Sequence, residues 1–187
     1  MNKKIFDQFP ILQTARLILR RIEKKDAPPI FEFNSGVDTM KYVPRDLLTE
    51  KDQGLERTNG FIQGFDEKTA IWWAFTYKSS ADPDQLIGYG GFFDINFQQQ
   101  SAELGYGLLK PYWGQGIMSE AVAEFLNFGL NKLKLNRIVA YIDIENTASI
   151  RVIEKFNFVK EETAKSNLFI RNRCFNLALY VLNSNGC

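Results

Sequence analysis

The sequence predicts an α/β fold: a mixed, mostly antiparallel twisted sheet with helices on both faces and a central βαβ unit. Three observations lead to this prediction. Several runs of β-forming residues precede Pro111, the hydrophobic period becomes helical after Gly116, and a near-continuous apolar strand follows at residues 137–144. No Pro/Gly/Ser-rich linker or internal repeat divides the chain, so residues 1–187 are expected to form one domain.

The first half of the chain predicts strands and two helices. Residues 14–22 are rich in β-forming residues, and Asp26 with the two prolines that follow it is typical of a helix start. A second helix is expected within residues 49–65, where apolar residues recur at helical spacing. Three strand-like runs joined by hairpin-type turns then predict an antiparallel meander, at residues 71–78, 86–95 and 102–109.

The second half predicts the βαβ unit. An apolar stripe that begins at Met118 indicates a long helix, and residues 137–144 are expected to form a buried strand parallel to the strand before that helix. Asn146 or Thr147 is expected to cap a short helix that stops at Asn157, a residue that tolerates the left-handed conformation. Two final strands close the sheet, at residues 158–164 and 174–182.

Composition narrows the classes of function. The chain has 45% hydrophobic and 24% charged residues, which is ordinary for a soluble globular protein. A net charge of +1 gives no global field, so neither nucleic acid nor a membrane is an expected partner, and any anion has to be bound locally. The N-terminus lacks an apolar run of signal length, so a cytoplasmic location is expected. The sequence carries no signal about the oligomeric state.

The chain contains no histidine, which excludes a Ser-His-Asp device, a His-ligated zinc and a histidine general base. Catalysis therefore has to use carboxylates, hydroxyls, lysines or backbone dipoles. Cys174 and Cys187 lack metal-ligand or disulfide spacing, so no metal site is expected. Cys174 is expected to be a small core residue of the penultimate strand rather than a nucleophile, because nothing nearby would activate it.

Gly114 and Gly116 lie where a central strand ends and the long helix begins. Backbone N–H groups at such a turn point outward, and the helix dipole adds positive charge there, so the turn can form a phosphate cradle. A tight loop whose glycines merely permit an unusual backbone is the alternative. The chain has no P-loop motif, and its GYGLLK fragment lies inside a strand-like run, so a dinucleotide-binding fold is set aside.

The segment AELGYGLLKPYWGQGIMSEA, followed further along the chain by NTASIRVIEKFNFVKEE, resembles the GCN5-related N-acetyltransferase (GNAT) superfamily. The segment TARLILRRIEKKD near the N-terminus looks like the opening of its RimJ/RimL-type branch. The resemblance extends from Thr14 to about Tyr180. It implies a GNAT fold and acetyl-CoA as the cosubstrate, without a metal.

The resemblance also implies which residues hold the cofactor. Its pyrophosphate would lie on the turn formed by Trp113, Gly114, Gln115, Gly116, Ile117 and Met118, with Ser119 close by. Its pantetheine arm would pair with Gly107, Leu108 and Leu109 and would be hydrogen-bonded to Asn146. Trp113 stands where the family has Gln or Arg, and Met118 where it has a small residue. Both changes leave the main-chain donors of the cradle in place.

The same resemblance suggests two catalytic residues. Glu103, near the start of the splayed strand, is the expected general base, although it could instead order the sheet through hydrogen bonds. Ser149 and Tyr141 are candidates to protonate the leaving thiolate, and Ser149 is favoured because it lies one helical turn after Asn146. Ser149 could equally be only a second hydrogen bond at the helix start.

These features lead to the hypothesis of an acetyl-CoA-dependent N-acetyltransferase that acts by direct attack in a ternary complex. The acceptor expected from the RimJ/RimL-type resemblance is a protein N-terminal α-amine, including those of ribosomal proteins. One alternative is a small amine such as a polyamine, an amino acid or an aminoglycoside. Another is a non-catalytic acyl-CoA-binding domain. A nucleotide-phosphate binder is disfavoured because the P-loop lysine and magnesium ligands are missing.

Overall fold

The structure of the chain is a computed structural model in which residues 1–82 and 84–184 are described, apart from the side chains of residues 162–166. Cys187, for which the sequence predicted no disulfide or metal partner, lies outside the described residues.

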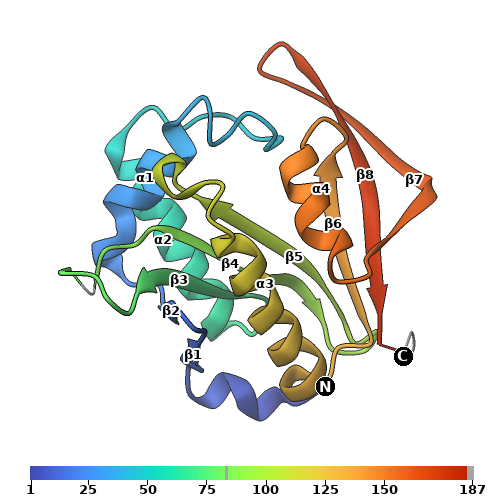
Figure 1. Ribbon diagram of the computed structural model, residues 1–187, viewed down its shortest axis with the longest axis horizontal. Helices are drawn as coiled ribbons and strands as arrows, with labels where there is room; N and C mark the ends of the chain where they lie inside the picture. The colour runs from blue at the N-terminus through green and yellow to red at the C-terminus, as the bar shows by residue number, and fades with distance from the viewer. Residues whose placement is uncertain (83, 185–187) are drawn as a thin grey trace.

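One eight-stranded sheet runs through the described chain (Figure 1). Its strands are β1 (Leu12–Gln13), β2 (Leu17–Arg21), β3 (Ile71–Tyr77), β4 (Gly88–Asn96), β5 (Ser101–Leu108), β6 (Arg137–Asp143), β7 (Val159–Ile170) and β8 (Arg173–Asn183). They lie in the order β1-β2-β3-β4-β5-β6-β8-β7. The pair β5–β6 is parallel and every other neighbouring pair is antiparallel. The predicted mixed, mostly antiparallel sheet is therefore confirmed.

Within the described residues, four α-helices cover the two faces of this sheet. They are α1 (Ala27–Ser35), α2 (Lys51–Asp66), α3 (Ile117–Phe128), which continues into a π-helical turn over Gly129–Leu133, and α4 (Thr147–Glu154). Short 3-10 helices occupy Lys3–Asp7, Lys24–Asp26 and Lys110–Tyr112. Helices α1 and α2 lie on one face, and α3 and α4 lie on the other (Figure 1). The succession β5, α3, β6 with parallel strands is the predicted central βαβ unit.

Alternate residues of β3 pack into two separate cores. Trp73 and Phe75 contact Phe125 of α3, with ring centroids 5.2 and 5.7 Å apart. Ala74, between them, belongs to the core beneath α1, together with Phe33. Because successive side chains of a strand point to opposite faces, a central strand covered by helices on both sides has to be apolar throughout. This requirement explains the run IWWAF at the start of β3.

Strand β6 departs from the prediction of a fully buried strand. Ile138, Ala140 and Ile142 are buried beneath α3 and α4, as expected. Tyr141, on the opposite face, is 44% exposed. The tyrosine is open because β6 and β5 separate beside it, which leaves a cavity where a fully paired sheet would have packed side chains.

The prediction that Cys174 is a core residue is wrong. Cys174 is exposed and lies near the start of β8, where it pairs with Phe169 close to the tip of the β7–β8 hairpin. Phe175, the next residue, is fully buried. The apolar run was assigned to the correct strand region, but alternation along that strand turns Cys174 to the solvent side.

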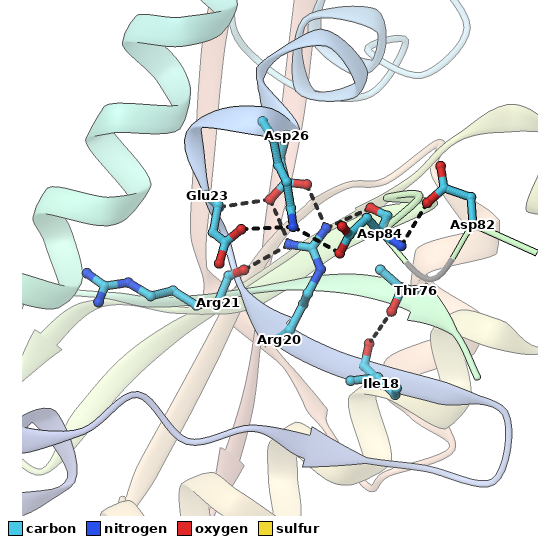
Figure 2. Close-up of polar contacts among 9 residues, drawn as sticks. Ile18, Arg20, Arg21, Glu23, Asp26, Thr76, Asp82 and Asp84 are labelled. Atoms are coloured by element: carbon cyan, nitrogen blue, oxygen red, sulfur yellow. Dashed lines mark hydrogen bonds and ion pairs between the residues drawn. The ribbon is translucent and has the colours of Figure 1, made fainter. Parts of the chain in front are cut away.

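Asp26 precedes α1 as predicted, but its carboxylate does not cap that helix. Its oxygens instead accept two hydrogen bonds from the Arg20 guanidinium, at 2.8 and 2.7 Å, and one from the Glu23 backbone N–H (Figure 2). Arg20 also donates to the Asp84 carbonyl of the β3–β4 connection. Asp26 is buried, so this cluster fastens the start of α1 to β2 through a charged pair that is shielded from water.

Candidate active site

The parallel strands β5 and β6 separate soon after they meet. They pair only at Ser101–Arg137, Ala102–Ile138 and Glu103–Val139. Beyond this point β5 stays paired with β4, and β6 stays paired with β8. The two halves of the sheet therefore diverge from Glu103 onward and leave a wedge-shaped gap between them.

Backbone groups of β5 line one side of this gap. The carbonyl of Gln100 accepts from the N–H of Arg137, and the N–H of Leu109 donates to Ile87 beside β4. Because successive residues of a strand direct their backbone groups to opposite sides, Leu104, Tyr106 and Leu108 direct theirs toward β6. These groups have no strand partner on that side, so an extended ligand with amide groups can pair with them.

A cavity of about 470 Å³ opens at the gap. Its wall is formed by α1, the loop between α1 and α2, α2 itself, β3 to β6, the start of α4 and β8. Of the residues predicted for the site, Glu103, Tyr141, Asn146 and Ser149 all contribute to this wall. The split sheet thus brings together the predicted base and the predicted thiolate partners, which lie on three different elements.

The environment of Glu103 changes its acidity. Burial of the carboxylate in the cavity wall, with Asp94 nearby, raises the pKa of Glu103 to about 7, and Arg45 acts in the opposite direction. A charged carboxylate loses hydration on burial, so the neutral form is favoured. A group with this pKa is present in both forms near neutral pH, which is the property of a general base that has to accept a proton and release it again.

Asn146 and Ser149 form the start of α4. The Asn146 Oδ1 atom accepts from the Ser149 N–H at 3.1 Å, which makes Asn146 the N-cap of the helix. The Tyr106 hydroxyl of β5 lies 3.4 Å from the Ser149 carbonyl, across the gap. Burial raises the pKa of Tyr106, so its hydroxyl keeps its proton and can act as a donor. Tyr106 was not predicted from the sequence.

The predicted cradle has the conformation that requires glycine. Gly114 and Gly116 both have φ of 74°, and Gly116 is the N-cap of α3. A Cβ at Gly114 would meet nothing within 4 Å, so the turn needs glycine for its backbone conformation and not for space. The turn is exposed, and Arg16 donates to the Gln115 carbonyl at 3.0 Å.

Other residues of the predicted cradle have different environments. Ile117 is buried in the core, which leaves only its backbone N–H for a ligand, and Met118 packs against the same core. Ser119 lies within 3.4 Å of Lys155 Nζ. Trp113 is 45% exposed, and its indole N–H donates to the Leu108 carbonyl at 2.7 Å. The indole thereby fastens the turn to the end of β5.

The predicted pantetheine stretch divides into two kinds of residue. Leu108 directs its backbone groups toward the gap, whereas Gly107 and Leu109 direct theirs toward β4. A Cβ at Gly107 would overlap the ring of Phe33, so this glycine permits the close approach of α1 to the sheet. Leu109 is buried in the same core.

Sequence reasoning also missed two cavity residues, Arg45 and Arg57. Arg57 lies four residues before Phe61 on the apolar side of α2, and this spacing could have indicated an inward position. Arg45 lies in a loop, where no periodicity predicts direction. In the described residues, no group of three or more His, Cys, Asp and Glu side chains is placed to hold a metal ion. No helix in the described ranges is long and apolar enough to cross a membrane.

A split parallel strand pair, a glycine turn at a helix N-terminus and a carboxylate of raised pKa in the gap together suit an enzyme of group transfer. They suit an extended anionic donor whose reactive end reaches the carboxylate. The family described as "Acetyltransferase (GNAT) domain" matches residues 16–159, and the chain belongs to this family.

Individual relatives agree with this assignment. The chain is similar to "Uncharacterized N-acetyltransferase YoaA" of Bacillus subtilis (strain 168), with 30% identity over 172 residues, which cover 92% of this chain and 96% of the relative. The protein is therefore an N-acetyltransferase that uses acetyl-CoA.

Two solved structures with coenzyme A share the fold. RimL, a ribosomal L7/L12 α-N-protein acetyltransferase, aligns with a TM-score of 0.79 and 18% identity over 93% of this chain and 98% of that one. Spermidine N-acetyltransferase from Vibrio cholerae, also in complex with spermine, aligns with a TM-score of 0.78 and 20% identity over 90% and 96%. By their names, these two proteins act on different kinds of amine.

Proposed function

We propose that the protein transfers the acetyl group of acetyl-CoA to the α-amine of a protein N-terminus, as a RimJ/RimL-type enzyme with residues 1–187 acting as one domain. The observation that carries this proposal is Glu103, a carboxylate with a pKa of about 7 in the wall of the cavity. An α-amine has a pKa of about 8 and is about one-tenth neutral at pH 7, whereas a lysine amine is neutral in only about one molecule in several thousand. A carboxylate of this strength is an adequate base for the α-amine.

The proposed binding mode for acetyl-CoA follows the gap. The pyrophosphate lies on the turn of residues 113–118, against the N–H groups of residues 114–118, because the Trp113 N–H already donates to the Lys110 carbonyl. Lys155 adds positive charge there, whereas Arg16 is paired with Glu120 at 2.6 Å. The pantetheine arm pairs with backbone groups of β5 that face the gap, including the N–H of Leu108, and contacts Asn146. This arrangement directs the thioester toward Glu103, because β5 runs from the turn back to that residue.

The proposed reaction is a direct attack. The amine nitrogen bonds to the thioester carbonyl carbon, and the C–S bond breaks with its electron pair on sulfur. The proton lost by the amine passes to Glu103, directly or through one water. The thiolate takes a proton from a hydroxyl in the gap, and that hydroxyl regains a proton from solvent. Ser149 remains the proposed donor, because the raised pKa of Tyr106 and its hydrogen bond to the Ser149 carbonyl make that hydroxyl a poor acid toward a thiolate.

The test is an assay of coenzyme A release with two acceptor panels, N-terminal peptides and small amines that include spermidine. Release with α-amine peptides, together with acetylated peptide in the mass spectrum, is the expected outcome. Release only with small amines would replace the proposed acceptor by the small-amine alternative. If the protein bound acetyl-CoA but released no coenzyme A with either acceptor panel, the proposed reaction would be contradicted.

A further inference from the structure

Two arginines differ from all the others in the chain. Seven of the nine arginines donate a hydrogen bond to a carboxylate, a carbonyl or a hydroxyl: Arg16, Arg20, Arg21, Arg137, Arg151, Arg171 and Arg173. The side chains of Arg45 and Arg57 make no hydrogen bond or ion pair with any described group. Both of them line the cavity at the gap.

The two guanidinium groups approach the cavity from neighbouring elements. Arg45 lies in the loop between α1 and α2, and its charge acts on Glu103. Arg57 lies on α2, where its guanidinium is 5.2 Å from the centroid of the Phe61 ring. The Arg57 Nε atom is buried without an acceptor. A buried N–H without an acceptor lowers the stability of the folded state, and an anion bound to the same guanidinium would offset part of that loss.

The carboxylates of the cavity do not neutralise this charge. Asp143 is buried and lies 3.2 Å from Arg173, a partner that it shares with Glu145 at 3.0 Å, so its charge is paired with Arg173 rather than with Arg45 or Arg57. Glu103 is only partly ionised near pH 7. The other titratable groups of the lining are tyrosines. The described wall therefore carries an excess of positive charge on the side of α1 and α2.

This charge lies away from the proposed cofactor phosphates. The exposed turn at Gly114 and Gly116 is not part of the cavity wall, and Lys155 and the Glu120-paired Arg16 lie beside it. Arg45 and Arg57 instead share the cavity with Glu103, the proposed base for the acceptor amine. Their position therefore indicates that they contact the acceptor rather than the cofactor phosphates.

We propose that the acceptor is an amine that carries a carboxylate or another anionic group close to the reacting nitrogen, and that Arg45 and Arg57 bind this group. A peptide N-terminus followed by acidic residues and a free acidic amino acid share this chemistry. A planar guanidinium recognises a carboxylate in two-point contact, whereas a polyamine would bring further positive charge against both arginines. This inference rests on the proposed function because it takes the cavity as the acceptor site.

The test measures equilibrium binding by calorimetry, with the protein saturated by coenzyme A so that turnover is not needed. The probes are three peptides that begin with Ser-Glu-Glu, Ser-Gln-Gln and Ser-Lys-Lys, together with free glutamate and spermidine. The variants are Arg45→Gln combined with Arg57→Gln, and Arg21→Gln as a control that removes one arginine outside the cavity, where it forms a surface ion pair with Asp66. Arg45→Gln alone provides a second variant at an exposed position in case the double variant is unstable.

We expect the acidic peptide to bind at least about tenfold more tightly than the lysine peptide, a ratio that 0.5 M salt reduces. The double variant should lose that preference, and Arg21→Gln should keep it. If the acidic peptide binds more tightly than glutamate, the acceptor is a peptide. If glutamate binds more tightly, the acceptor is an amino acid. Equal or tighter binding of the lysine peptide or spermidine, no binding of any acidic probe, or an unchanged preference in the double variant would overturn the inference. A preference for acidic probes without acetyl transfer would instead overturn the proposed function alone.

Discussion

Among single residues, Glu103 carries the clearest pH dependence. Its pKa is raised to about 7 by burial, and the attacking α-amine has a pKa of about 8. Because both groups must be unprotonated, kcat/KM of the wild-type enzyme should fall with two ionisations below pH 7. Glu103→Gln should lower kcat/KM by about 10²-fold at neutral pH and leave a single ionisation, that of the amine. The measurement is kcat/KM against pH for both proteins.

The stability of the same variant provides a control. The folded-state pKa of Glu103 lies above its unfolded value of 4.5, so the wild type loses stability as pH rises from about 4.5 through 7. After allowance for partial solvent screening, the loss is about 1–2 kcal/mol. Glu103→Gln, which cannot ionise, should be more stable than the wild type at pH 8 and nearly equal at pH 4.5. If Glu103→Gln lowered kcat/KM but its pH profile still showed two ionisations, Glu103 would order the site and would not be the general base.

Asp26 differs from Glu103 because both of its carboxylate oxygens accept hydrogen bonds from the Arg20 guanidinium. Asp26→Asn would leave the Arg20 guanidinium, which is mostly buried, without a charged partner, and breaking such a pair costs about 3–5 kcal/mol. Asp66→Asn removes a similar ion pair with Arg21 at the surface and should cost about 0–1 kcal/mol. Urea unfolding of both variants measures the difference. Equal losses would mean that the Arg20–Asp26 pair is as well hydrated as a surface pair.

At the scale of elements, the β7–β8 hairpin holds the loop that carries Arg45. The Arg171 guanidinium donates to the carbonyls of Met40 and Val43 at 2.7 and 2.8 Å, and Arg173 donates to the carbonyl of Lys41. Arg171→Met should release this loop, because its carbonyls lose charged donors. The KM for the acceptor should rise severalfold, while the dissociation constant for acetyl-CoA stays within about twofold. An equal loss of acetyl-CoA affinity would show that the hairpin supports the whole sheet instead.

The turn before α3 allows the converse test, in which a substitution weakens the binding of acetyl-CoA rather than that of the acceptor. Gly116→Ala places a Cβ in a left-handed conformation, which costs about 1–2 kcal/mol, and the strain is relieved if the turn changes shape. Acetyl-CoA binding should therefore weaken by about tenfold, since the cradle depends on backbone direction. Gly60→Ala is the matched control, because Gly60 lies within α2 and a Cβ there meets nothing within 4 Å. Undiminished affinity of a folded Gly116→Ala protein would refute the cradle.

Periodicity and helix-start signals in the sequence predicted the order and type of α1 to α4 and of β2 to β8, whereas the two-residue strand β1 and the short 3-10 helices were not predicted. The change of period after Gly116 gave α3, and the parallel pair β5–β6 followed from it. Pairing partners and side-chain direction in irregular segments depend on tertiary contacts, and these were less predictable. Cys174 was assigned to the core because its strand is apolar, and Arg45 was missed because its loop is oriented by the distant hairpin.

For the molecule as a whole, the split sheet separates two tasks. The edge of β5 and the turn before α3 face the proposed cofactor, and helices α1 and α2 with their loop face the proposed acceptor (Figure 1). Glu103 lies where β5 and β6 diverge, between the two sides. The outer pairs β4–β5 and β6–β8 keep the halves apart without help from a ligand. The gap is therefore a property of the folded chain.

A gap formed in advance should bind acetyl-CoA without unfolding or rearranging the sheet, so binding energy should appear directly as stability. At a concentration one hundred times its dissociation constant, a ligand that binds only the folded state stabilises it by about 2.7 kcal/mol. For a domain of this size, that corresponds to a rise in Tm of about 5–10 °C. Differential scanning calorimetry with acetyl-CoA, and with ATP at the same concentration, measures it. An equal rise with ATP would indicate that the turn binds phosphates without using the gap, whereas a rise with acetyl-CoA alone would support a pantetheine arm that lies between β5 and β6.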